Sequence, residues 1–157
     1  MTISNTSPSR LSGSRSLLKA LPLLLLLLLW ADGAWSAECS QNSYFLGTQA
    51  EVDALGATGC DSVVGDLQID GPTDITNLDG LANLTSVGVG LIIGNNAALT
   101  NLDGLANLTS VVVSLIIDNN NALTNLNGLA NLTSVGGGLF IGNNAALTNL
   151  DGLANLT

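Results

Sequence analysis

Paired asparagines recur at a fixed interval and form the most regular polar pattern in the sequence. Positions one repeat apart become a row in space when repeats stack, with neighbours about 4.8 Å apart. An asparagine amide can bind a sugar or peptide group, and it can equally satisfy backbone groups within a bend. We therefore predict two rows that either face a protein or glycan ligand or stack inside the fold. The two rows are Asn95, Asn119 and Asn143, and Asn96, Asn120 and Asn144.

Acidic residues form a third row, which consists of Asp79, Asp103, Asn127 and Asp151. Calcium prefers about six to eight oxygen ligands, and Asn127 interrupts the carboxylates, so the row favours Asp-Gly turns over a calcium site. Two carboxylates can also hydrolyse a glycosidic bond that they flank. Asp79 and Asp103, about 5 Å apart in such a row, are the one pair that would suit this reaction.

Most catalytic residue types are missing from the repeats. The chain contains no His, and its three basic residues, Arg10, Arg15 and Lys19, precede every repeat. A lyase would draw on Lys or Arg, and no glycine-rich phosphate loop precedes a helix signal. We therefore predict that the protein is not an enzyme and has no catalytic residues, metal or cofactor.

The two cysteines, Cys39 and Cys60, are predicted to form a disulfide. Two thiolates are too few for a zinc site, and no His is present to complete one. Export to an oxidising compartment would allow the bond to form. Closing a loop of this span stabilises a fold by about 3 kcal/mol in the chain-entropy model.

Four Asn-Leu-Thr triplets match the acceptor pattern for N-glycosylation in secreted eukaryotic proteins. They begin at Asn83, Asn107, Asn131 and Asn155. The central leucine is also an apolar position of the repeat, so the triplet is equally a by-product of the repeat. Glycans on successive repeats would crowd one another, and we do not expect all four sites to be occupied.

Residues 1–36 have the pattern of a secretory signal peptide. Basic residues precede an apolar run, Ala20–Trp30, and small residues follow it. The run rises only about 16 Å as a helix, too short for a hydrocarbon core of about 30 Å. Ala34 and Ser36 favour cleavage before Ala37, with an uncleaved signal-anchor as the alternative. The sequence therefore predicts a secreted or cell-surface protein, held to a membrane only if the signal stays uncleaved.

The net negative charge of the chain limits the classes of partner that it can bind. Of twelve acidic residues only Asp32 lies within the first 36, so the remainder carries eleven carboxylates and no Lys or Arg. Phosphate binding needs Lys or Arg, so we predict no nucleic-acid partner and no anionic lipid partner. An extracellular protein or glycan is the expected partner.

Segments of 24 residues repeat without insertion from Ile75 onward. Such self-similarity predicts a solenoid, in which each repeat covers the apolar side of its neighbour. Leu115 and Ile117 alternate with other residues, which indicates a strand with one face inward. Apolar residues from Leu123 to Leu132 are three positions apart, which favours a 3-10 or irregular path over an α-helix. The predicted fold is mainly β, a parallel β-solenoid of 24-residue rungs.

A short helix is predicted ahead of the repeats. Thr48 and Glu51 have the spacing of a capping box, and Gly56 would end the helix. Cys60 takes the repeat position of Leu84 and should point inward, so its disulfide would join the helix segment to the first rung.

Two structural regions follow the predicted signal peptide. Residues 37–62 would form an N-terminal cap with the helix and disulfide, and residues 63–157 would form the solenoid. The C-terminal end of the solenoid is expected to be open or part of a longer array. An open end exposes apolar core and unpaired strand groups, so we predict self-association there as an alternative to further repeats.

Three stretches carry a resemblance to a known family: CDSVVGDLQI from Cys60, LDGLANLTSV from Leu78 and LIIGNN from Leu91. They resemble the receptor L-domain family, a β-helical relative of leucine-rich repeats. The resemblance spans about residues 39–157 and implies a right-handed parallel β-helix. Members supply ligand-binding lobes of insulin- and epidermal-growth-factor-type receptors and stand-alone repeats of microbial surface proteins. The chain is shorter than a receptor lobe and poor in aromatics, so the resemblance implies exported binding or adhesion without signalling.

Three hypotheses for function follow from these features. The first is a non-catalytic exported module for recognition or adhesion, which binds a protein or glycan along the strand face or at the Asn-rich bend. The second is a structural spacer in a larger cell-surface protein, which the near-identity of the repeats favours. The third is a carboxylate-based glycan hydrolase. The family resemblance favours the first hypothesis.

Overall fold

The computed structural model describes residue 39, residues 41–72 and residues 74–157. All of them belong to one compact unit, Ser36–Thr157. The predicted signal peptide, residues 1–36, lies outside the described residues. The described unit consists mainly of parallel β-sheet with few helices, so the prediction of a mainly β, solenoid-like fold is confirmed at that level.

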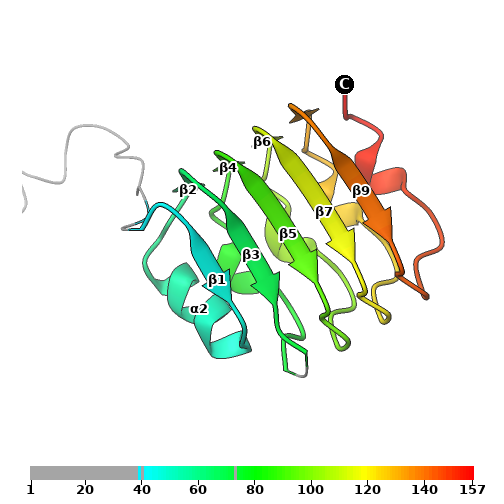
Figure 1. The fold of residues 1–157 in the computed structure, drawn as a ribbon, viewed down its shortest axis with the longest axis horizontal. Helices are drawn as coiled ribbons and strands as arrows, with labels where there is room; N and C mark the ends of the chain where they lie inside the picture. The colour runs from blue at the N-terminus through cyan, green and yellow to red at the C-terminus, as the bar shows by residue number, and fades with distance from the viewer. Residues whose placement is uncertain (1–38, 40, 73) are drawn as a thin grey trace, which may run out of the picture. The chain divides into compact units, whose positions relative to one another are not determined.

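Five parallel strands form the larger of two sheets, and they lie side by side in chain order in Figure 1. After each of the first four long strands the chain passes through one helix and one short strand. The next long strand then pairs with the long strand before it. The five strands are β1 (Tyr44–Leu46), β3 (Leu67–Asp70), β5 (Gly90–Gly94), β7 (Ser114–Asp118) and β9 (Leu139–Gly142).

Four two-residue strands form the second parallel sheet, again in chain order. They are β2 (Ser62–Val63), β4 (Ser86–Val87), β6 (Ser110–Val111) and β8 (Ser134–Val135). Val87 pairs with Val111 in this sheet, and Leu91 pairs with Leu115 in the larger one. From β2 onward, residues one sequence repeat apart are therefore neighbours in both sheets.

Alternation along the long strands places one apolar row inside. Leu115 and Ile117 of β7 are fully buried, whereas Ile116 between them points outward and is partly exposed. Leu139 of β9 stacks on Leu115 but is 43% exposed, because β9 has a neighbouring strand on one side only. Leucines, isoleucines and valines from successive repeats thus form one continuous core.

The leucines spaced three apart form short 3-10 helices, as the sequence predicts. In the third of these, the Leu129 amide donates to the Leu126 carbonyl at 2.8 Å. Leu126, Leu129 and Leu132 are all fully buried, so this turn directs its leucines into the core. The helices are η2 (Asp79–Leu81), η3 (Asp103–Leu105), η4 (Asn127–Leu129) and η5 (Asp151–Leu153).

The predicted helix is present as α2 (Gln49–Ala57). Its capping box is complete: the Glu51 amide donates to Thr48 Oγ1 at 3.3 Å, and the Thr48 amide donates to Glu51 Oε2 at 3.0 Å. Gly56 does not end the helix as predicted, since α2 continues to Ala57 and the left-handed residue is Gly59, with φ 73°. Gly56 instead lies against the backbone of Gly80 in η2, where a Cβ would collide.

The Cys39–Cys60 disulfide is present, with the two Cα atoms 5.1 Å apart. Cys60 is only 6% exposed and belongs to the apolar core, as its repeat position predicts. The Cys39 amide also donates to the Ser62 carbonyl at 3.5 Å. The bond therefore ties the segment before β1 to the beginning of β2.

Glycine at the middle of each 3-10 helix allows the close approach of successive rungs. A Cβ at Gly104 would collide with the carbonyl group of Leu78, one at Gly128 with that of Leu102, and one at Gly152 with that of Leu126. Every Asp-Gly-Leu or Asn-Gly-Leu triplet therefore needs its glycine for backbone packing.

We predict that Gly104→Ala destabilises the fold by about 1–3 kcal/mol, because the added methyl group must displace the backbone of the preceding rung. Gly94→Ala is the matched control: its Cβ would meet only the Asp118 carbonyl oxygen, at 3.7 Å. Chemical denaturation should show little change for the control. Equal losses in the two variants would contradict the close-packing role.

We also predict that Cys39→Ala/Cys60→Ala lowers the free energy of unfolding by about 3 kcal/mol, because the loop of 21 residues is no longer closed in the unfolded state. Denaturant titration with and without reductant measures the effect. Reductant should shift the midpoint of the parent protein and leave that of the double variant unchanged. A parent midpoint insensitive to complete reduction would count against this role.

Candidate binding surface

The second asparagine of each pair lies inside the fold and links successive rungs. Asn96 and Asn120 are fully buried. Asn120 Nδ2 donates to the Ile93 carbonyl at 2.9 Å, and Asn120 Oδ1 accepts from the backbone amide and the Nδ2 of Asn96, both at 3.1 Å. Asn144 repeats this pattern, donating to Ile117 and accepting from Asn120. The row satisfies buried backbone groups of the bend.

This geometry corrects the ligand-facing interpretation for Asn96 and Asn120, because neither side chain reaches the surface. The row of Asn96, Asn120 and Asn144 is instead an internal stack of amides, which is the second interpretation that the sequence allowed. Asn144 is partly exposed, since β9 has only one neighbouring strand.

The first asparagine of each pair is exposed and has left-handed backbone geometry. The φ angles are 55° at Asn95, 58° at Asn119 and 49° at Asn143, a region that Asn tolerates better than most residues. Asn95 Nδ2 donates to both carboxylate oxygens of Asp70, at 3.2 and 3.3 Å. Asn119 and Asn143 each donate to Asp118 at 2.8 Å. This row therefore lies at the surface and orients two carboxylates.

Large side chains form a line across the outer face of the five-stranded sheet. Register pairs Phe45, Gln68, Ile92, Ile116 and Phe140 in succession. Both phenylalanines of the chain belong to this central row, and they are 62% and 53% exposed. Exposed aromatic side chains on a sheet are typical of interaction surfaces.

This central row was not predicted from the sequence. Its signal was present, because Ile92, Ile116 and Phe140 are apolar at positions that alternate with buried residues. A strand with one solvated face normally places polar residues there.

Small residues and carboxylates form a row on each side of the central row. One flanking row contains Asp66, Gly90 and Ser114, and Asp66 Oδ1 accepts from the Gly90 amide at 2.9 Å. The other flanking row pairs Asp70, Gly94, Asp118 and Gly142.

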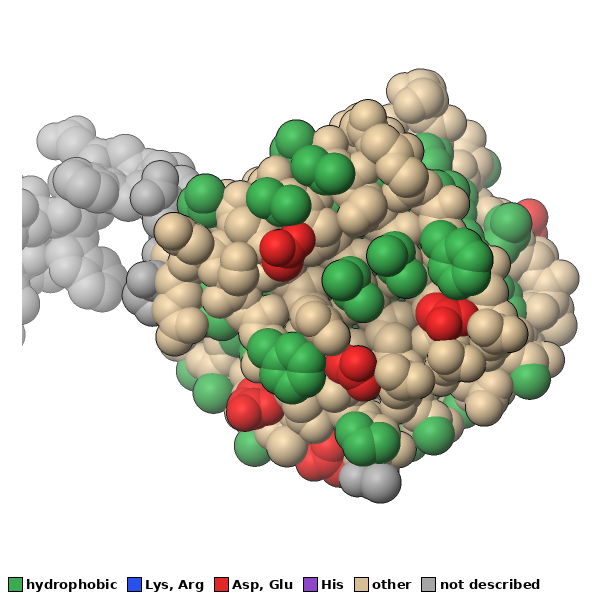
Figure 2. Space-filling model, viewed as in Figure 1, with side chains coloured by type: hydrophobic (Ala, Val, Ile, Leu, Met, Phe, Trp, Pro, Cys, Tyr) green, Lys and Arg blue, Asp and Glu red, His purple; other side chains and the backbone are tan. Residues whose placement is uncertain are grey.

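Figure 2 shows the result from outside: green apolar side chains cross the face of the sheet, with red carboxylates on both sides of them. A second apolar group lies where the chain turns into the long strands. Its members are Val64, Val89, Val112 and Val113, all exposed. The outer face thus combines apolar contact area with acceptor oxygens.

The candidate glycosylation asparagines are exposed, but three of their amides are already used. Asn107 Nδ2 donates to the Ala82 carbonyl at 2.7 Å. Asn131 and Asn155 donate in the same way to the preceding rung. Glycosylation of Asn83, Asn107 and Asn131 stays a prediction.

The acidic row has the geometry of turns. The backbone amides of Asp79 and Asp103 donate to Asn77 and Asn101 Oδ1, at 3.1 and 3.0 Å. The Asp79 and Asp103 side chains are exposed. Among the described residues, no three acidic, cysteine or histidine side chains converge as they would to hold a metal ion.

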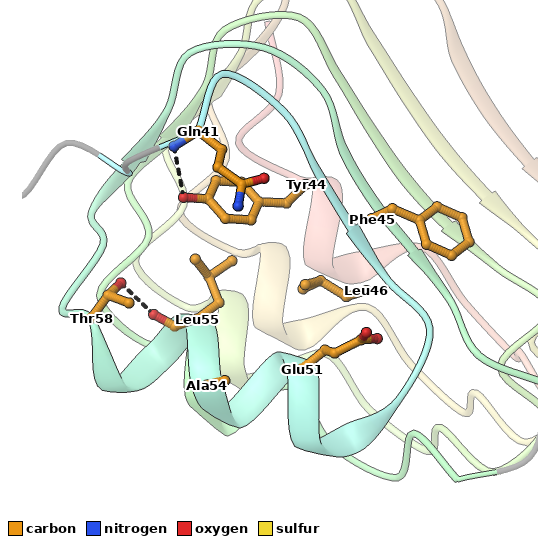
Figure 3. A pocket seen from close by; sticks show the side chains of 8 residues that line it. All are labelled: Gln41, Tyr44, Phe45, Leu46, Glu51, Ala54, Leu55 and Thr58. Carbon is orange, nitrogen blue, oxygen red and sulfur yellow. Dashed lines mark hydrogen bonds between the residues drawn. The ribbon is translucent and has the colours of Figure 1, made fainter.

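A shallow pocket of about 310 Å³ lies beside α2 (Figure 3). Leu46, Leu55 and Ala54 contribute apolar walls, and the Tyr44 hydroxyl accepts from the Gln41 amide at 3.1 Å. Glu51 also lines it, but its carboxylate is occupied by the capping box. The pocket has no pair of groups arranged for acid–base chemistry.

Comparison with models of known families, with curated proteins and with solved structures finds no match to this chain. The described part of the chain contains no helix with the length and apolar character needed to cross a bilayer.

We predict that Asn120→Ala destabilises the protein by about 3 kcal/mol, because it leaves the buried Asn96 backbone amide without its acceptor and removes the side-chain bond to the Ile93 carbonyl. The matched control is Asn119→Gly, which keeps the left-handed backbone and should change stability by less than about 1 kcal/mol. Thermal and denaturant unfolding of both variants measures the difference. Similar stability of the two variants would contradict the internal role of the Asn120 row.

Proposed function

We propose that the protein is a non-catalytic exported recognition or adhesion module that binds an extracellular protein or glycan through the outer face of its five-stranded sheet. The proposal includes the finer architecture: a right-handed parallel β-solenoid of 24-residue rungs, similar to receptor L domains, with α2 as its N-terminal cap. It also includes secretion or display at the cell surface.

The positions at which the repeats differ carry this proposal. The three complete repeats, residues 75–98, 99–122 and 123–146, differ at eight positions, and five of these lie within residues 88–94 or their equivalents. Those segments contain the turn into the long strand and the outward positions of the strand. The inward leucines of the same strands are identical. A uniform spacer would give no reason for variation to gather on one face.

The chemistry of that face suits recognition. Ile92, Ile116 and the two phenylalanines offer apolar area, while Asp70 and Asp118 offer oriented acceptors. A row of apolar and aromatic groups with polar groups on both sides resembles the apolar core and polar rim of a binding surface. Apolar residues and exposed carboxylates in a row do not form a catalytic constellation, so the hydrolase alternative has less support.

The disulfide supports export, since such bonds persist mainly in extracellular and other oxidising compartments. The basic and leucine-rich start of the sequence supports the same conclusion. Together they favour a secreted or surface-displayed module over an intracellular one.

The test is binding of the exported protein to a panel of immobilised extracellular proteins and polysaccharides. Ile116→Gln/Phe140→Gln should lower the bound signal at least about tenfold for the true ligand, because two apolar contacts are lost. Gln68 already occupies the same row, so glutamine is compatible with the strand. The control Asp103→Asn changes a 3-10 turn outside this face to the residue that Asn127 already supplies, and it should leave binding unchanged.

Ligands bound equally by the double variant would exclude the outer face as the binding site. A panel without any ligand would contradict recognition and favour the spacer. Release of reducing ends from the polysaccharides would contradict the non-catalytic assignment.

A further inference from the structure

We infer that the partner of the outer face is a cationic amphipathic α-helix, whose apolar stripe lies along the central row and whose Lys or Arg side chains reach the flanking carboxylates. The inference rests on the proposed function and names the partner's chemistry. It follows from three features of the described surface: the length of the central row, the small residues beside it, and the position and sign of the charges.

The central row has the dimensions of a short helix. It crosses five strands, so its ends, Phe45 and Phe140, lie about 19 Å apart at about 4.8 Å per strand. A helix rises about 1.5 Å per residue, so about 13 residues cover this distance. Phe45 and Phe140 at the two ends, with Ile92 and Ile116 between them, offer apolar contact, and Gln68 is the one polar residue of the row.

The flanking rows leave room for a cylinder. Gly90 and Ser114 on one side, and Gly94 on the other, are smaller than the isoleucines between them, whereas the Phe140 ring packs over Gly142. The flanking rows lie two residues to either side of the central row, about 13 Å from each other at about 3.3 Å per residue. A helix with its side chains measures about 10–12 Å across, so both of its edges reach the flanking rows.

The charges lie where a basic helix would place its lysines. Asp66 stands on one side of the central row, and Asp70 and Asp118 stand on the other. Asn95, Asn119 and Asn143 hold the two carboxylates of the second side through hydrogen bonds. These carboxylates therefore do not need to be ordered by the partner.

No Lys, Arg or His occurs among the described residues, so an acidic partner would meet only repulsion. A basic amphipathic helix has an apolar stripe with cations on both of its edges, the complement of this three-row surface. The side chains that an extended peptide directs to one face form a single line, which does not match a central row with a flanking row on each side. The hydroxyls of a neutral glycan would donate to the carboxylates but would carry no charge to complement them.

The probe is a synthetic helical peptide of about 14 residues, with leucines along one stripe and lysines at both edges of it. A second peptide has the same composition with the leucines distributed around the helix. A third, extended peptide alternates Lys and Leu. Binding of each labelled peptide to the full-length protein exported from an expression host is measured by fluorescence anisotropy at low and physiological salt.

The striped peptide should bind, and Ile116→Gln should weaken it about tenfold through the loss of one central apolar contact. Asp70→Asn/Asp118→Asn should weaken it about fivefold and reduce its salt dependence. The matched control, Asp103→Asn/Asp151→Asn, removes the same charge from the turns, where Asn127 already replaces aspartate. This control should bind the peptide like the parent. Unchanged denaturation midpoints confirm that each variant is folded.

Several results would overturn the inference. Equal binding of the scrambled peptide, or an equal loss in the Asp103/Asp151 control, would show general charge attraction. Tighter binding of the alternating peptide would show an extended partner. If a ligand from the panel binds through Ile116 but the striped peptide does not bind, the helical partner is refuted and the proposed function is retained. Absence of any ligand that depends on Ile116, this peptide included, would refute both.

Discussion

The structure depends on one constraint: residues at equal positions in successive repeats must be backbone neighbours. Parallel pairing in both sheets, the buried asparagine row and the glycine contacts all use this register. A shift of one residue would place Gly104 and its equivalents away from the carbonyl groups that exclude a Cβ. It would also remove Asn120 from the backbone groups it satisfies. Apolar stacking drives the assembly, and these close contacts set its register.

The same constraint separates the positions that must be constant from those that are free. An inward leucine has to match the rung on each side, so one sequence solution recurs in every repeat. An outward residue contacts only its row neighbours and solvent, and can differ from one rung to the next. The two phenylalanines and Asp118 occupy such positions. Differences between repeats are therefore tolerated on the outer face of the larger sheet.

Much of the architecture was predictable from residues alone. The alternation of Leu115 and Ile117 indicated a strand, and the three-residue leucine spacing indicated 3-10 turns, because both patterns reflect local backbone geometry. The capping box predicted the start of α2. The end of the helix was not predictable. Glycine is the residue type expected just after a helix, but Gly56 lies within α2 and is required for contact with Gly80. The roles of the two asparagine rows were likewise undecided, because adjacent identical residues give no indication of which one faces inward.

The sequence by itself determined the repeat period, the identity of the core residues, the absence of basic side chains after Lys19 and the pairing of the two cysteines. These follow from composition and spacing, which do not depend on how the rungs meet. Only the tertiary structure decided that Asn120 is buried while Asn119 orients Asp118. It also decided that Phe45, far from Phe140 in the chain, lies in the same exposed row. Such relations arise from contacts between turns of the chain, and no local pattern encodes them.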